Sequence, residues 1–107
     1  MIIISARPKA SLTLTTGNGS TSTAIKAFDS VTLACTFDEE KQLNFKFYKD
    51  SHLKQDWSSD NSFQIPSFIK DHVGRYKCMA RQSNQQNNHS AFSEELHLSV
   101  GKLPSRL

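Results

Sequence analysis

The sequence lacks the features by which many enzymes and membrane proteins are recognised. No run of about 18 apolar residues occurs in its 107 residues, so no membrane-spanning helix is expected. The four histidines form no His-x-x-x-His pair and the two cysteines no Cys-x-x-Cys pair, and neither a nucleophile elbow nor a phosphate-binding loop is present. We therefore expect no catalysis, no cofactor and no metal site.

A strong charge of one sign is also missing. The net charge is +3, and the 13 lysines and arginines form no block, so nucleic-acid binding is not expected. Helical periodicity of useful length and internal repeats are absent as well. What remains is a chain of the size of one domain, whose 36% hydrophobic content is enough for a single core.

Alternation of apolar and polar residues is the main pattern that is present. In residues 31–37, every second residue from Val31 to Phe37 is apolar or cysteine, which is typical of a half-buried strand. Similar stretches predict further strands at residues 7–16, 25–28, 43–49, 63–65, 74–82 and 94–100, with a short strand and a loop within 50–60. The sequence therefore predicts an all-β domain.

Residues 71–78, which read DHVGRYKC, carry the most specific motif. Tyr76 lies two residues before Cys78, so both side chains point to the same face of a strand. Gly74 permits a tight turn into that strand. The Gly-x-Tyr-x-Cys run resembles the tyrosine corner of immunoglobulin domains, in which the tyrosine hydroxyl bonds to upstream backbone and the cysteine closes an inter-sheet disulfide.

This resemblance implies a disulfide between Cys78 and Cys35, the only other cysteine. It also implies a buried aromatic between the cysteines. Phe47 follows Cys35 by twelve residues and takes the place of the usual tryptophan, whereas Trp57 lies too late. A disulfide in turn implies an oxidising compartment. The alternative is a cytosolic protein with two unrelated thiols.

Three stretches narrow the resemblance to Fc-receptor-like and leukocyte immune-type receptor ectodomains. They read FKFYKD at 45–50, HVGRYKC at 72–78 and SEELHLSV at 93–100. The resemblance implies an immunoglobulin-like two-sheet antiparallel sandwich with Greek-key topology, of the short, non-variable type with one C′ strand. We expect the domain to span residues 7–100, with 1–6 as a linker or expression start and 101–107 as a linker towards a following domain.

The same resemblance implies an extracellular recognition domain of a membrane-anchored immune receptor, which binds a protein partner without catalysis. Two sequons, at Asn18 and Asn88, fit such a glycoprotein. The alternatives are a spacer that positions another binding domain and an adhesion domain that pairs weakly with itself. The fold alone does not name a ligand.

A candidate binding surface follows if the strands at 43–49, 74–82 and 94–100 are neighbours. Their outer face would gather basic, aromatic and methionine side chains, namely Lys46, Tyr48, Lys77, Met79 and Arg81. Tyrosine, methionine and arginine are enriched in protein interfaces. The alternative is an ordinary solvated sheet face that carries lysines.

Overall fold

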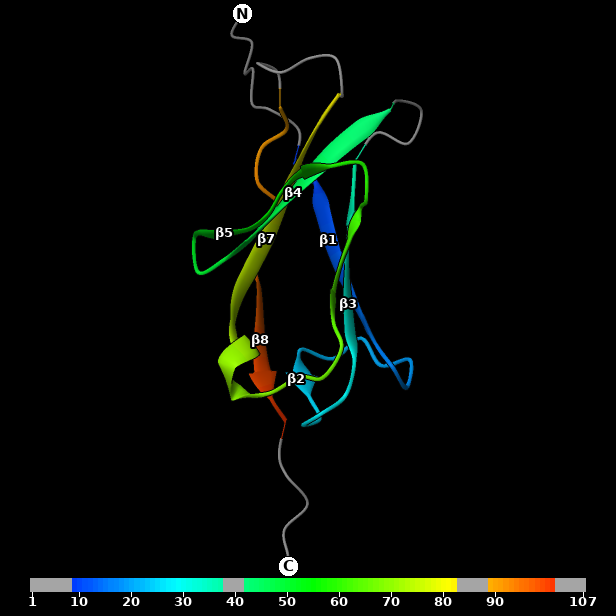
Figure 1. The fold of residues 1–107 in the computed structure, drawn as a ribbon, viewed down its shortest axis with the longest axis vertical. Coiled ribbons are helices and arrows are strands. Elements are labelled where there is room, and N and C mark those ends of the chain that lie inside the picture. Colours follow the sequence, from blue (N-terminus) through cyan, green and yellow to red (C-terminus); the bar gives the residue numbers. More distant parts are fainter. Residues whose placement is uncertain (1–8, 38–41, 83–88, 102–107) are drawn as a thin grey trace, which may run out of the picture.

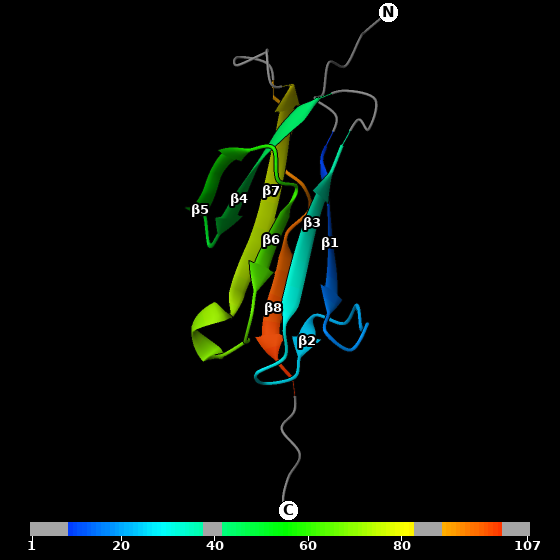
Figure 2. The same ribbon diagram turned by 45° about the vertical axis from the view of Figure 1, so that its right-hand side comes forward.

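The computed structural model describes residues 9–37, 42–82 and 89–101, which form two β-sheets packed face to face (Figure 1, Figure 2). The three-stranded sheet has the order β1 (Ser11–Thr16), β3 (Val31–Thr36) and β6 (Ser62–Ile65). The five-stranded sheet has the order β2 (Ala24–Ile25), β8 (Leu96–Val100), β7 (Gly74–Gln82), β4 (Leu43–Lys49) and β5 (His52–Ser58). The predicted two-sheet, all-β sandwich is confirmed.

Most strand pairs are antiparallel, and β2 is the exception because it runs parallel to β8. One 3-10 turn, η1 (Lys70–His72), precedes β7. In the described part of the chain no helix is long and apolar enough to cross a membrane.

Four elements differ from the sequence prediction. The strand predicted at residues 25–28 is only Ala24–Ile25, and Phe28 lies outside it with a positive φ. The first strand begins at Ser11, and Lys9 forms only a single bridge to Ala91. The strand within 50–60 is seven residues long, not short. The last strand begins at Leu96 and not at 94, because residues 90–93 follow β7 on an irregular path described below. The strands at 43–49 and 74–82 have the predicted bounds.

The core lies between the sheets around the disulfide. Cys35 of β3 and Cys78 of β7 are bonded across the sandwich, with their Cα atoms 6.1 Å apart, which confirms the predicted disulfide. Phe47 of β4 is paired in register with Cys78 and is only 1% exposed. Its ring stacks on Phe63 of β6 at 5.8 Å between centroids, so one aromatic pair spans both sheets beside the bridge.

The start of β7 is fixed by a tyrosine corner. The Tyr76 hydroxyl donates to the backbone carbonyl of His72 at 2.5 Å, and the His72 ring accepts the backbone N–H of Ile69. Phe68 is buried in the core below this corner, whereas the next residue, Ile69, is 39% exposed. Burial raises the pKa of Tyr76 to about 12.

Gly74 has a different role from the predicted tight turn. A Cβ at this position would lie 2.7 Å from Oδ2 of Asp50, and the backbone of Gly74 is not in the left-handed region. Asp50 and Ser51 do have positive φ, as the two central residues of a tight β4–β5 hairpin often do. Gly74 therefore lets this hairpin turn pack against β7, where Asp50 also accepts the backbone N–H of Arg75.

Candidate protein-binding site

The outer surface of the five-stranded sheet brings the five predicted binding residues together. Lys46 and Tyr48 alternate with the buried Phe45 and Phe47 on β4, so they point away from the core. On the neighbouring strand β7, the residues that face the same way are Lys77, Met79 and Arg81. The register pairs Lys46 with Met79 and Tyr48 with Lys77, so the five side chains form one patch.

Two aromatic residues that the sequence analysis did not include complete this patch. They are Trp57 of β5 and Phe92, which precedes β8. We call the seven residues the outer-face site: Lys46, Tyr48, Trp57, Lys77, Met79, Arg81 and Phe92. The β4–β5 hairpin that carries Trp57 projects from the body on the side away from β1 and β3 (Figure 1, Figure 2).

Cations and aromatic rings form one continuous row across the site, in the order Arg81, Trp57, Lys46, Tyr48, Phe92 and Lys77. The guanidinium carbon of Arg81 lies 4.2 Å from the centroid of the Trp57 ring. The Lys46 ammonium lies 5.1 Å from the same centroid and 5.7 Å from that of Tyr48. Tyr48 meets Phe92 edge to face at 5.3 Å, and the Lys77 ammonium lies 4.0 Å from the Phe92 centroid. Each of these distances is in the range of a cation–π or aromatic pair.

Trp57 reaches the row because β5 is irregular. Phe45 pairs with Ser58 and Phe47 with Gln55, so two β5 residues stand against Lys46 alone. Such a bulge breaks the two-residue period and re-aims side chains. The polar composition of residues 50–60 gave no indication of this bulge or of the position of Trp57. The only sequence signal was the presence of a single tryptophan.

Phe92 is held by two serines that bond to β7. The Ser93 hydroxyl accepts the backbone N–H of Cys78 at 3.0 Å, and the Ser90 hydroxyl accepts that of Ala80 at 2.9 Å. The backbone N–H groups of the same serines donate to the carbonyls of Cys78 and Ala80. Side-chain oxygens thus replace strand carbonyls, and Phe92, 36% exposed, lies between the two clamps.

Met79 faces outward as predicted, but its side chain is more buried than a contact residue is expected to be. It lies on the outer side of β7, but it is only 7% exposed. Because its thioether is covered, Met79 supports the row from below and offers a partner little direct contact. The exposed surface of the site comes from the rings and the cationic groups around it.

The cations of the site are poorly neutralised. Lys46 lies 3.9 Å from a carboxylate oxygen of Asp56, at the limit of an ion pair. Lys77 and Arg81 form no ion pair within the described residues, and Nε of Arg81 is buried without a hydrogen-bond acceptor there. The nearby carboxylate of Glu94 is engaged by Lys9 at 2.7 Å, a hydrogen bond that lowers the pKa of this carboxyl.

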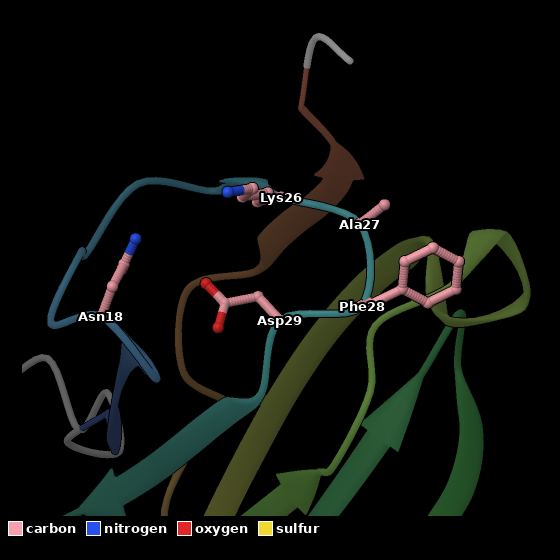
Figure 3. Close-up of a pocket in the computed structure, with 5 residues that line it drawn as sticks. All are labelled: Asn18, Lys26, Ala27, Phe28 and Asp29. Atoms are coloured by element: carbon pink, nitrogen blue, oxygen red, sulfur yellow. The ribbon is translucent and has the colours of Figure 1, made fainter. Parts of the chain in front are cut away.

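The predicted sequon residue Asn18 lies elsewhere, at the turn after β1. It is exposed, and its side-chain oxygen accepts from the Thr16 hydroxyl and the backbone N–H of Ser20. It lines an open depression of about 310 Å³ together with Asp29 and Phe28. Figure 3 shows the Asp29 side chain directed to the side of Asn18 and the Phe28 ring directed away from it. The second sequon residue, Asn88, lies outside the described residues.

No metal-binding constellation accompanies these sites. In residues 9–37, 42–82 and 89–101, no three His, Cys, Asp or Glu side chains lie close enough to hold a metal ion. The outer-face site offers cationic donors, aromatic faces and a supporting thioether.

Comparison with known proteins agrees with this architecture. Residues 15–100 match the immunoglobulin domain family. The crystal structure of the second Ig-C2 domain of human Fc-receptor like A is similar at a TM-score of 0.67 and 28% identity, covering 86% of this chain and 98% of that one. No curated protein matches the sequence. The chain belongs to the immunoglobulin domain family, and within it resembles an Fc-receptor-like domain.

Proposed function

We propose that this domain recognises a protein ligand for an immune-type cell-surface receptor, without catalysis, and that the outer-face site makes the contact. The observation that carries this proposal is the continuous row of cations and aromatic rings between Arg81 and Lys77. Aromatic residues and arginine are the side chains that most often dominate the binding energy of protein interfaces. The likeness to a domain of an Fc-receptor-like protein supports the receptor context.

A pure spacer domain fits the surface less well. A spacer needs no apolar group on its solvated sheet face, yet Leu53 and Phe92 are 48% and 36% exposed here. Leu53 of β5 is paired in register with Tyr48, so apolar surface borders the row. Exposed apolar groups next to cations are typical of an interaction surface.

A self-pairing adhesion domain also fits less well. Two copies meeting face to face would oppose three cations with three cations, which is unfavourable. Edge-to-edge pairing beside the outer-face site would use β5, an edge strand of the five-stranded sheet, but its register shifts twice along β4. Such irregular edges disfavour the addition of another strand.

An extracellular position is part of the proposal, with this domain as one part of a longer, membrane-anchored glycoprotein. The Cys35–Cys78 disulfide supports an oxidising compartment. Asn18 supports glycosylation, because its sequon lies in an exposed turn.

Expression in a glycosylating host should therefore give a mass excess that peptide N-glycosidase removes. That excess should be absent from Asn18→Gln if this is the only used sequon, and reduced if Asn88 is used as well.

The function is tested with a fluorescent tetramer of the domain and a library of cells that each express one extracellular protein. We expect at least one protein to bind the wild-type tetramer and a Thr32→Ala tetramer, but not a Tyr48→Ala with Arg81→Ala tetramer. Thr32 is the control because it lies on β3, in the other sheet. If no protein binds in a way that depends on the outer face, the spacer alternative replaces this proposal.

A further inference from the structure

We infer that the partner surface is acidic: its carboxylates pair with Lys77, Arg81 and Lys46, while its apolar groups cover Tyr48, Trp57 and Phe92. This inference rests on the proposed function and adds the chemistry of the ligand to it.

The first reason is the uncompensated charge. Lys77 and Arg81 have no acidic partner among the described residues, and Lys46 has only a distant one in Asp56. Glu94 is already paired with Lys9, and the exposed Glu95 forms no ion pair in the described part of the chain. The unpaired cations therefore favour a partner surface that supplies negative charge.

The second reason is that the cations are held in position. Long lysine and arginine side chains normally lose rotamer freedom when they bind, which weakens association. Here each charged head already rests on a ring: Arg81 on Trp57, Lys46 between Trp57 and Tyr48, and Lys77 on Phe92. Binding a carboxylate to these groups requires little further ordering.

The third reason is the geometry of Arg81. Its guanidinium carbon stacks on Trp57, and its Nε is covered, so a partner can reach only the outer, terminal amino groups. A planar guanidinium presented in this way suits a carboxylate that binds with both oxygens. Lysine could not replace it, because a point charge does not offer the two parallel donors.

An acidic protein fits the site better than a sulfated polysaccharide. The site has three cations in a short row, whereas its rings and the neighbouring Leu53 present apolar surface that a highly charged sugar leaves uncovered. A protein segment supplies carboxylates together with apolar side chains. The polysaccharide is the competing outcome in the experiment below.

The inference is tested by NMR titration of the ¹⁵N-labelled domain with a short peptide of alternating glutamate and tyrosine. A glutamine and tyrosine peptide and a heparin-derived oligosaccharide are the comparison probes. We expect saturable shifts of the amides at residues 46–48, 57 and 77–81 with the glutamate peptide. The affinity should fall when salt is raised from about 0.1 M to about 1 M, because the Debye length shortens from about 10 Å to about 3 Å.

Two double variants with the same change in net charge provide the control. Lys77→Glu with Arg81→Glu should weaken binding at least about fivefold, equivalent to about 1 kcal/mol. Lys26→Glu with Lys70→Glu alters exposed lysines outside the site and should bind almost as wild type. If the charge reversal disturbs the spectrum of the free domain, Lys77→Gln with Arg81→Gln gives the same test with less repulsion.

Three results would overturn the inference. Equal binding of the glutamine peptide would show that binding does not depend on the negative charge of the ligand. The proposed function would then stand with a neutral partner. Tighter binding of the heparin oligosaccharide at the same amides would make the ligand a polysaccharide. Absent shifts, or shifts outside the site, would mean that the site does not bind acidic peptides. Failure of the proposed function is a different result, because only the cell-library experiment tests it.

Discussion

Two aromatic residues of this domain serve different purposes although both lie on the five-stranded sheet. Phe47 points inward and is packed beside the disulfide at 1% exposure. Trp57 points outward and is partly exposed under two cations. In the sequence, the position of Phe47 relative to the cysteines was enough to predict its burial and to exclude Trp57 from that place, but it did not predict the outward contacts of Trp57.

We expect Phe47→Ala to lower the free energy of unfolding by about 3–5 kcal/mol, because it leaves a cavity in the core. Trp57→Ala should cost clearly less, since its ring is already partly in water. Chemical denaturation of both variants against wild type measures the two costs. The opposite ranking would mean that the inward and outward faces of the sheet have been confused.

Tyr76 gives the domain a specific loss of stability in alkali. Burial raises the pKa of its hydroxyl from 10.0 to about 12. Between these values the unfolded chain releases the proton and the folded chain keeps it, so stability falls as pH rises from 10 to 12. The slope that this one group contributes is at most about 1.4 kcal/mol per pH unit.

Tyr76→Phe isolates this effect. The variant should lose about 1 kcal/mol at neutral pH, because the hydrogen bond to the His72 carbonyl is gone. It should also lose less stability than wild type between pH 10 and pH 12. Parallel slopes of the two proteins in denaturant titrations across this range would contradict the assignment.

At the scale of elements, the irregular segments create the outer-face site. Strands β4 and β7 keep a strict two-residue period, and their bounds were predicted from sequence. The bulges of β5 and the serine clamps at residues 90–93 break that period. Periodicity therefore predicted Lys46, Tyr48, Lys77 and Arg81 but missed Trp57, which depends on the β5 bulge, and Phe92, which depends on the serine hydrogen bonds to β7.

The serine clamp makes a prediction of its own. Ser93→Ala leaves the buried backbone N–H of Cys78 without its acceptor, so the free energy of unfolding should fall by about 1–3 kcal/mol. Ser99→Ala is the matched control on β8, because the Ser99 hydroxyl makes no hydrogen bond within the described residues, and it should change stability by less than about 0.5 kcal/mol. Equal free energies of unfolding for the two variants would show that the Ser93 hydrogen bond does not stabilise the fold.

At the scale of the whole molecule, the disulfide ties the two sheets together. It joins residues 43 positions apart, and closing a loop of this length stabilises the fold by about 4 kcal/mol through the reduced entropy of the unfolded chain. This is comparable to the net stability of a small domain. The Cys35→Ala with Cys78→Ala variant should therefore be partly unfolded at 37 °C by circular dichroism, and a thermal midpoint unchanged from wild type would contradict this.

The central claim is that the outer face of the five-stranded sheet, and not the opposite sheet, binds a protein partner. The most direct measurement is the dissociation constant for the partner identified in the cell library, for wild type and for single alanine variants. Tyr48→Ala and Arg81→Ala should each weaken binding by at least about 1 kcal/mol, and Thr32→Ala should leave it unchanged. Equal tolerance of all three substitutions would contradict the claim and place recognition in another part of the protein.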